Sequence, residues 1–211
     1  MPLAAGETVG TLCSPGSFRA GEWEMCTLST TMTAKTDTSG WFALKVFYRR
    51  TASIERILND AGCETYVPRV VVEKIDGGVK YAASPYVSSL LFVRCTESYL
   101  VDFKKSHDTD FLYYIDLATK RPGRIRDEEF NNFRAATLIQ DPEAEYLGSD
   151  TSWFKDGARV RVTQGVHAGR EGWIRRIKGH KRFIVCIEGV SAVAFQAIPP
   201  AFLEVLEPSK R

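Results

Sequence analysis

The sequence lacks a long hydrophobic run. No apolar stretch approaches the roughly 18 residues that a membrane-spanning helix needs, and the N-terminus lacks the basic start and apolar core of a secretory signal. These absences argue against the membrane-spanning and secreted classes, so we expect a cytoplasmic protein. Hydrophobic residues (44%) and charged residues (26%) occur at ordinary levels, which favours a folded globular chain.

Residues that bind metals or perform catalysis are few and scattered. The three histidines lack HxxxH spacing and the five cysteines contain no CxxC pair, which disfavours a zinc site and a disulfide framework. No Cys or Ser lies in a nucleophile motif, and no glycine-rich phosphate loop is present. We therefore expect reduced thiols, no metal, no cofactor and no enzymatic activity. A thiol pair of Cys63 with His107 stays open at this level.

The length of 211 residues favours two compact domains. Residues 1–40 are rich in Ser, Thr and Gly without periodicity, and we interpret them as a disordered tail. An acidic linker is predicted over residues 141–152, because its first ten residues carry four carboxylates and no Lys or Arg. The two domains are then residues 41–140 and residues 153–211. The second carries 11 Lys or Arg against 5 Asp or Glu, which suggests an anionic partner.

Between residues 41 and 140, strand-length runs alternate with amphipathic helices. Ile54, Ile57, Leu58 and Ala61 recur at helical spacing and predict one apolar stripe. The expected elements are a strand at 41–48, a helix around 54–61, strands at 63–72 and 86–95, a helix at 97–105, a strand at 111–115 and a last helix from Asp127, with a hairpin turn at 76–78. This order is the ferredoxin-like plan, an α+β fold with one antiparallel sheet and helices on one face.

Residues 153–211 contain only short strands between regularly placed turns. About five strands over this length predict a small closed barrel. The segment 154–174 resembles a KOW motif, because alternating Val160 and Val162 precede Gly165, a spacer, and two further glycines. Glycine tolerates the positive φ and the close packing that such a barrel corner needs.

The segments before this barrel narrow the resemblance. Trp41-Phe-Ala-Leu, the amphipathic helix and Tyr66-Val-Pro-Arg are similar to the start of the N-terminal domain of the NusG family. Residues 85–94, Pro-Tyr-Val-Ser-Ser-Leu-Leu-Phe-Val-Arg, resemble the family's Pro-Leu-x-Pro-Gly-Tyr-x-Phe-Val segment. Residues 197–206 resemble the end of bacterial NusG-type KOW domains. The resemblance covers about residues 41–207 and implies a NusG domain followed by an SH3-like KOW barrel.

This resemblance implies a transcription elongation or antitermination factor that acts by binding alone. In the family, an apolar patch of the N-terminal domain docks onto the clamp helices of RNA polymerase and favours processive elongation. Tyr86, Leu90 and Phe92 are the expected polymerase-binding residues, since aromatic and aliphatic anchors carry interface energy. The competing interpretation is that they are ordinary sheet core. Ser88-Ser89 replaces the usual Pro-Gly, which favours a specialised, operon-specific paralogue resembling RfaH or the capsule-operon antiterminators.

Cationic and aromatic residues surround the first strand-to-helix junction. They are interpreted as a nucleic-acid-binding group, in which cations contact phosphates of non-template DNA or nascent RNA and Tyr48 stacks on a base. A solvated surface is the alternative interpretation for each of them. The group consists of Lys45, Tyr48, Arg49, Arg50 and Arg56.

The KOW domain is expected to bind a second partner, which in the family is a termination factor or a ribosomal protein. The predicted contact residues are Val166, His167, Arg170 and Trp173. His167 occupies a position where the family's housekeeping members carry a partner-contacting Phe. We expect a monomer. The alternative function is an RNA-binding, ribosome-associated KOW protein, which would use the basic barrel surface on RNA.

Overall fold

A computed structural model describes residues 37–75, 79–85, 87–139, 141, 143–148 and 157–209, and for 70–75 and 79–85 it describes the backbone only. The predicted tail up to residue 36 and the predicted turn at 76–78 lie outside the described residues. Asp37 accepts hydrogen bonds from the backbone amides of Glu97 and Ser98, at 3.2 and 3.3 Å. The end of the predicted tail is therefore attached to the folded domain.

The N-terminal domain is built on an antiparallel sheet. Its strand order is β2-β5-β1-β6, and β7 also pairs with β1. The strands are β1 (Gly40–Val46), β2 (Glu64–Tyr66), β5 (Leu90–Cys95), β6 (Phe111–Tyr113) and β7 (Arg124–Ile125). In β1 and β5 almost every side chain is buried, because helices cover both faces of this part of the sheet.

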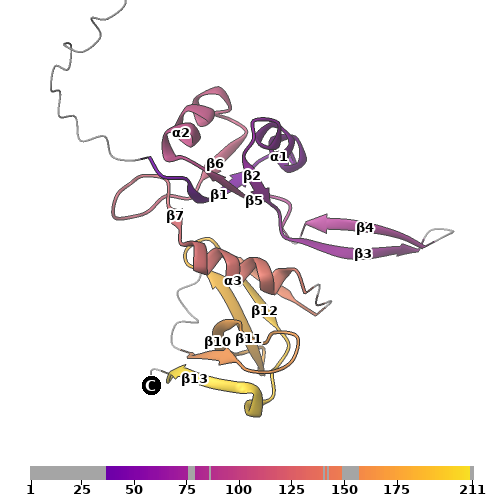
Figure 1. Ribbon diagram of the computed structural model, residues 1–211. Coiled ribbons are helices and arrows are strands. Elements are labelled where there is room, and N and C mark those ends of the chain that lie inside the picture. Colours follow the sequence, from indigo (N-terminus) through magenta and orange to yellow (C-terminus); the bar gives the residue numbers. More distant parts are fainter. Residues whose placement is uncertain are drawn as a thin grey trace, which may run out of the picture. The chain divides into compact units, whose positions relative to one another are not determined.

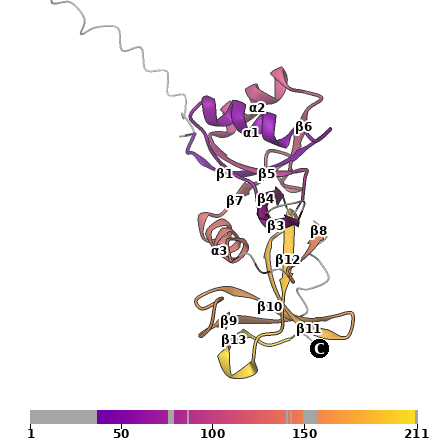
Figure 2. The ribbon, with the colours of Figure 1, turned by 90° about the vertical axis from the view of Figure 1, so that its right-hand side faces the viewer.

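The three helices divide between these two faces. Helices α1 (Thr51–Asp60) and α2 (Glu97–Ser106) cover one face, where Phe42 and Leu44 pack against Ile54 and Leu100. Helix α3 (Asp127–Thr137) packs on the opposite face (Figure 2). The two helices of the predicted ferredoxin-like plan, α1 and α2, therefore lie on one face, and the last predicted helix, α3, covers the other. Thr96 caps α2 by accepting a hydrogen bond from the Tyr99 amide.

The predicted strand at 63–72 is two strands. Pro68 separates β2 from β3 (Arg69–Ile75), since proline has no N–H to donate to a strand ladder. Strand β3 pairs with β4 (Val79–Pro85) in a separate two-stranded sheet (Figure 1).

The C-terminal part is an all-β domain, called the β domain below. Its strands form one antiparallel sheet in the order β13-β9-β10-β11-β12-β8. They are β8 (Glu145–Gly148), β9 (Ala158–Val162), β10 (Glu171–Ile177), β11 (His180–Ile187), β12 (Ser191–Phe195) and β13 (Leu203–Glu207), with the short helix η1 (Pro200–Phe202) before the last. The predicted architecture, an α+β domain followed by a small all-β domain, is confirmed.

Two details of the β domain differ from expectation. Strand β8 lies inside the segment predicted as a linker, and it pairs with β12 from Glu145 to Gly148. The domain is therefore longer than residues 153–211. Within the described part of the chain, no strand pairing joins the end strands β13 and β8, so hydrogen bonds do not close the sheet on itself.

Helix α3 contacts the β domain as well as the sheet of the N-terminal domain. The side-chain amide of Asn132 donates to the backbone carbonyl of Glu171 at 2.7 Å and accepts from its amide at 3.1 Å. Glu129 accepts a hydrogen bond from the amide of Glu188 at 2.7 Å. One cluster of buried side chains includes Phe130 of α3 together with Phe183 of β11. The described residues accordingly belong to one compact unit.

Candidate nucleic-acid and protein interfaces

The turn between β1 and α1 has a strained backbone. Tyr48 and Arg49 are consecutive non-glycine residues with positive φ, 54° and 57°. This left-handed conformation disfavours residues with a Cβ by roughly 1–2 kcal/mol each. The Tyr48 side chain is 79% exposed, so burial of its ring does not explain the strain. Strained, exposed positions of this kind occur often at binding sites.

Neighbouring contacts hold this turn in place. The amide of Phe47 donates to the carbonyl of Asp110 at 2.8 Å, and Arg50 forms an ion pair with the Asp110 carboxylate. The hydroxyl of Thr51 donates to the carbonyl of Ser88. The side chains of Tyr48 and Arg49 are therefore presented from a fixed backbone.

The five predicted nucleic-acid-binding residues do not share one surface. Lys45 is exposed, but it alternates with Leu44 and Val46, which face α1 and α2, so it points to the other face of the sheet. Arg56 is exposed on α1. The structure brings together only Tyr48, Arg49 and Arg50 on the turn, with Arg50 engaged by Asp110.

The residues predicted to contact polymerase are placed differently. Leu90 is 2% exposed and Phe92 is fully buried, and both belong to the core beneath α3. The Phe92 ring packs against Phe130 and Phe133 of that helix, with centroids 5.4 and 5.8 Å apart. This placement corrects the expectation of an exposed patch, and the core interpretation holds for both residues. The sequence alone left both interpretations open, because a strand covered on both faces has no polar alternation. Tyr86 lies outside the described residues.

Exposed apolar side chains of the N-terminal domain occur elsewhere, at the sheet edge and the following loop. Leu112, Ile115 and Leu117 are 50%, 53% and 81% exposed. Asp116 orders this loop by accepting hydrogen bonds from the amides of Ala118 and Thr119, at 2.7 and 3.3 Å. These residues are not among those that the sequence predicts as a binding surface. The sequence feature that indicates them is an apolar run that continues beyond the short edge strand β6 as far as Leu117.

The loop between β9 and β10 contains Val166 and His167, which are placed in opposite ways. Val166 is 76% exposed. His167 is 7% exposed, and its ring packs against Phe195 with centroids 4.6 Å apart. Burial lowers the pKa of His167, an effect that the nearby Asp141 opposes. His167 is thus mainly a core residue of the β domain, which corrects its predicted role as an exposed contact.

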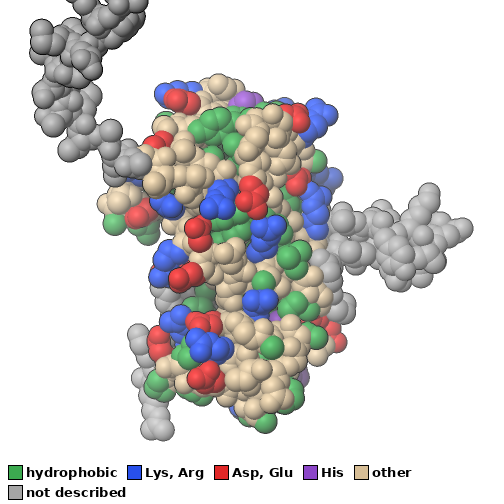
Figure 3. Space-filling view, viewed as in Figure 1, with side chains coloured by type: hydrophobic (Ala, Val, Ile, Leu, Met, Phe, Trp, Pro, Cys, Tyr) green, Lys and Arg blue, Asp and Glu red, His purple; other side chains and the backbone are tan. Residues whose placement is uncertain are grey.

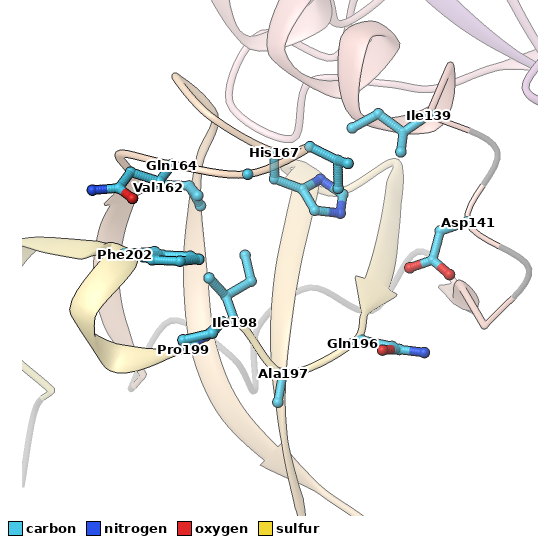
Figure 4. Close-up of a pocket in the computed structure, with 12 residues that line it drawn as sticks. Ile139, Asp141, Val162, Gln164, His167, Gln196, Ala197, Ile198, Pro199 and Phe202 are labelled. Atoms are coloured by element: carbon cyan, nitrogen blue, oxygen red, sulfur yellow. The ribbon is translucent and has the colours of Figure 1, made fainter.

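A pocket of about 450 Å³ lies beside this loop. Figure 4 shows the His167 ring between Ile139 and Ile198, with Phe202 and Pro199 on the η1 side of the pocket. Nδ1 of His167 is buried and has no hydrogen-bond partner among the described protein atoms. The pocket therefore combines apolar side chains with polar ones, which are His167, Asp141, Gln164 and Gln196.

Charged side chains of β9 and β10 largely neutralise one another. The Glu171 carboxylate accepts from Arg159 at 3.0 Å and from Arg161 at 2.7 Å. Arg159 also lies over the ring of the half-buried Trp173, 5.9 Å from its centroid. Of the predicted contact residues in the KOW-like segment, Arg170 and Trp173 are both partly buried. In Figure 3, blue and red side chains are likewise interspersed on the visible face.

The hairpin of β10 and β11 places like charges opposite one another. Arg175 pairs in register with Arg182, and Arg176 pairs with Lys181. Directly opposed like charges destabilise a sheet unless an anion compensates them. The sequence shows that these residues are basic. It does not show which of them lie opposite one another, because the register of β10 and β11 depends on the geometry of the turn between them.

The described residues were also compared with the requirements of a metal site and of a membrane-spanning helix. There, no group of three or more His, Cys, Asp or Glu side chains is arranged to hold a metal ion. None of the described helices is long and apolar enough to cross a membrane. The possible Cys63–His107 pair finds no support, because the His107 ring stacks on Phe103 at 4.3 Å and Cys63 interacts with Tyr99.

The N-terminal domain matches a known protein family. Residues 39–134 match the family model described as NusG, transcription termination factor nusG. A solved structure titled "Domain interaction in Thermotoga maritima NusG" aligns with 81% of this chain and 98% of its own, at 18% identity and a TM-score of 0.41. No curated protein sequence matches the chain. Because the family match spans the sheet, helices α1 and α2 and the strained turn, residues 39–134 are a NusG domain.

Proposed function

We propose that this chain binds RNA polymerase through its NusG domain, promotes processive elongation on particular operons, and recruits a second partner through its β domain. The observation that carries the proposal is the match of residues 39–134 to the NusG family. The action is binding without catalysis. The sequence resemblance to operon-specific antiterminators supports the restriction to particular operons.

The strained turn supports a contact with nucleic acid. Tyr48 offers an exposed ring on which an unpaired base can stack, and the adjacent Arg49 offers a cation for phosphate. A single-stranded partner fits best, because its bases are free to stack. Non-template DNA and nascent RNA both meet this requirement. Arg50, which is paired with Asp110, is a weaker neighbouring cation.

For the polymerase contact, the exposed apolar side chains are better placed than the buried ones. Leu112, Ile115 and Leu117 lie at the edge of the sheet and on the ordered loop that follows. Burial of such side chains contributes roughly 25 cal/mol per Å² of apolar area. We therefore assign the polymerase-facing surface to this edge.

For the second partner, Val166 is the central residue. It is 76% exposed and it borders the pocket that contains His167 and the apolar side chains of Ile139, Ile198 and Phe202. A partner that covers Val166 and inserts an apolar side chain into the pocket would bury both. A protein partner, such as a ribosomal protein or a termination factor, fits this surface.

The paired cations of β10 and β11 favour one alternative function, RNA binding by the β domain. Arg176 and Lys181 are both exposed and opposite one another. A phosphate backbone would relieve their repulsion. In this case the chain would act as an RNA-binding, ribosome-associated protein.

The deciding experiment measures binding of the full chain to core RNA polymerase from its own host. We expect tight binding by the native chain, a large loss in the double variant Ile115→Asp/Leu117→Asp, and retention in Leu138→Asp. Leu138 is a matched control because its side chain is 58% exposed and lies at the end of α3. If the native chain does not bind core RNA polymerase, the polymerase proposal is overturned. Tight binding to RNA, abolished by Arg176→Glu/Lys181→Glu, would then establish the alternative.

A further inference from the structure

Two cysteines of the NusG domain lie opposite one another at the end of a strand pair. Strand β2 pairs with β5 so that Glu64 lies opposite Arg94. Continuing this antiparallel register by one residue places Cys63 opposite Cys95. Both side chains belong to the core cluster beneath α1 and α2, and both thiols are free.

The hydrogen bonding at this position indicates which kind of strand pair the two cysteines form. The amide of Cys63 donates to the carbonyl of Leu58 at 2.9 Å and is therefore not used in the ladder with β5. Directly opposed residues that do not exchange ladder hydrogen bonds have Cα atoms only about 4.5 Å apart, with their side chains on the same face. A disulfide requires Cα atoms roughly 4.4–6.8 Å apart. The backbone therefore already has the spacing of a cross-strand disulfide.

The surroundings of the two thiols are consistent with this proximity. Tyr99 of α2 forms a hydrogen bond with Cys63, and both thiols influence the pKa of its hydroxyl. Burial raises the pKa of Cys95 to about 12, with smaller contributions from Cys63 and Asp37. Cys95 is 6% exposed, whereas Cys63 is only partly buried. An oxidant therefore reaches Cys63 first.

We propose that Cys63 and Cys95 form a reversible disulfide when the protein meets a low-molecular-weight disulfide. In the first step the Cys63 thiolate attacks one sulfur of oxidised glutathione, the glutathione S–S bond breaks, and one glutathione thiolate leaves. In the second step the Cys95 thiolate attacks Sγ of Cys63 and releases the second glutathione. Each protein thiol loses its proton to solvent, and the two electrons lost by the protein reduce one glutathione disulfide to two thiols.

This bond would fasten the chain that follows α1 to the last residue of β5 (Figure 1). The loop that it closes contains β2, β3, β4 and most of β5, so the unfolded chain would lose much conformational freedom. Oxidation would thus make the NusG domain more resistant to unfolding, and thiols would reverse the change. This modification site is independent of any binding surface proposed above.

The test uses the full chain with the three other cysteines replaced, Cys13→Ser/Cys26→Ser/Cys186→Ser. After treatment with oxidised glutathione, we expect both remaining thiols to disappear, the mass to fall by two hydrogen atoms without a glutathione adduct, and the melting temperature to rise by roughly 5–10 °C. Dithiothreitol should restore all three properties. The same background with Cys95→Ser is the matched control, and it should end as a glutathione adduct at Cys63.

Three outcomes would overturn the proposal: two titratable thiols after oxidation, a stable adduct at Cys63 beside a reduced Cys95, or a disulfide between two chains. If circular dichroism shows that the background variant does not fold, non-reducing peptide mapping of the oxidised native chain decides instead. A linked pair of peptides containing Cys63 and Cys95 supports the proposal. Pairing of either residue with another cysteine contradicts it.

Discussion

The indole ring of Trp41 stacks on the ring of Phe130, with centroids 3.7 Å apart and planes 19° from parallel. Trp41 lies in the first strand of the NusG domain and Phe130 in its last helix. Both are almost completely buried. This contact joins the two ends of the domain sequence and covers the sheet face opposite α1 and α2.

Replacement of Phe130 should therefore destabilise the NusG domain strongly. Phe130→Ala removes a ring that also contacts Tyr66 and Phe92, so we expect a loss of about 3–5 kcal/mol in the free energy of unfolding. Urea denaturation followed by tryptophan fluorescence measures it. Leu117→Ala, at an 81% exposed position, is the control and should change stability by less than about 0.5 kcal/mol. Equal effects of the two substitutions would show that α3 does not close the core.

The same contact illustrates what the sequence could and could not predict. The period of the apolar residues predicted the strands and helices of the NusG domain, because burial of one face imposes that period. It could not tell which side chains of a run such as Leu90–Val93 meet α3, since both faces are covered. Leu90 and Phe92 were consequently predicted as surface anchors, although they are core residues.

The sequence predicts a site residue where its side-chain type and its near neighbours in the chain define its role. It does not predict burial or backbone strain that depends on tertiary contacts. The Tyr48–Arg49 turn was found as a cationic, aromatic junction, but its strain is a property of the backbone. His167 was predicted as a partner contact because it occupies the position of a partner-contacting Phe in the family that the segment resembles. Its burial follows from Phe183 and Phe195, which come from strands later in the chain.

Two glycines of the KOW-like segment, Gly165 in the loop and Gly172 in β10, serve separate structural needs. Gly165 has a φ of 85° and open space around its Cα, whereas a Cβ on Gly172 would lie 2.7 Å from the Phe183 ring and closer still to the Ile184 carbonyl. Gly172→Ala should therefore unfold the β domain or cost more than about 3 kcal/mol, since backbone cannot yield as a side chain can. Gly165→Ala should cost only about 1 kcal/mol, the strain of positive φ. Thermal unfolding of the two variants tests this order, and a milder effect at Gly172 would contradict the close β10–β11 packing.

Arg49 combines a strained backbone with the proposed contact to nucleic acid. Arg49→Gly should raise stability by up to about 1 kcal/mol, because glycine adopts the φ of 57° without strain. The same change should weaken binding to a single-stranded oligonucleotide and lower the salt slope by about one. Lys120→Gly is the matched control, since Lys120 also has a positive φ, 56°, but lies in the β6–β7 loop. The Lys120→Gly variant should be more stable than the native chain, and its binding to the oligonucleotide should be unchanged. An unchanged salt slope in Arg49→Gly would remove the proposed phosphate contact.

Protonation of His167 should make the β domain less stable in mild acid. Burial lowers the pKa of His167 in the folded state below its ordinary value of 6.5, so the folded state prefers the neutral imidazole. The contribution of this group is fully present above the unfolded pKa and is lost as the pH falls through the folded pKa. We expect the urea midpoint of the native chain to fall more between about pH 7.5 and pH 5 than that of His167→Gln. His180→Gln, at an exposed position, should retain the native pH dependence. Parallel curves for the native chain and His167→Gln would show that this imidazole is not held neutral by the core.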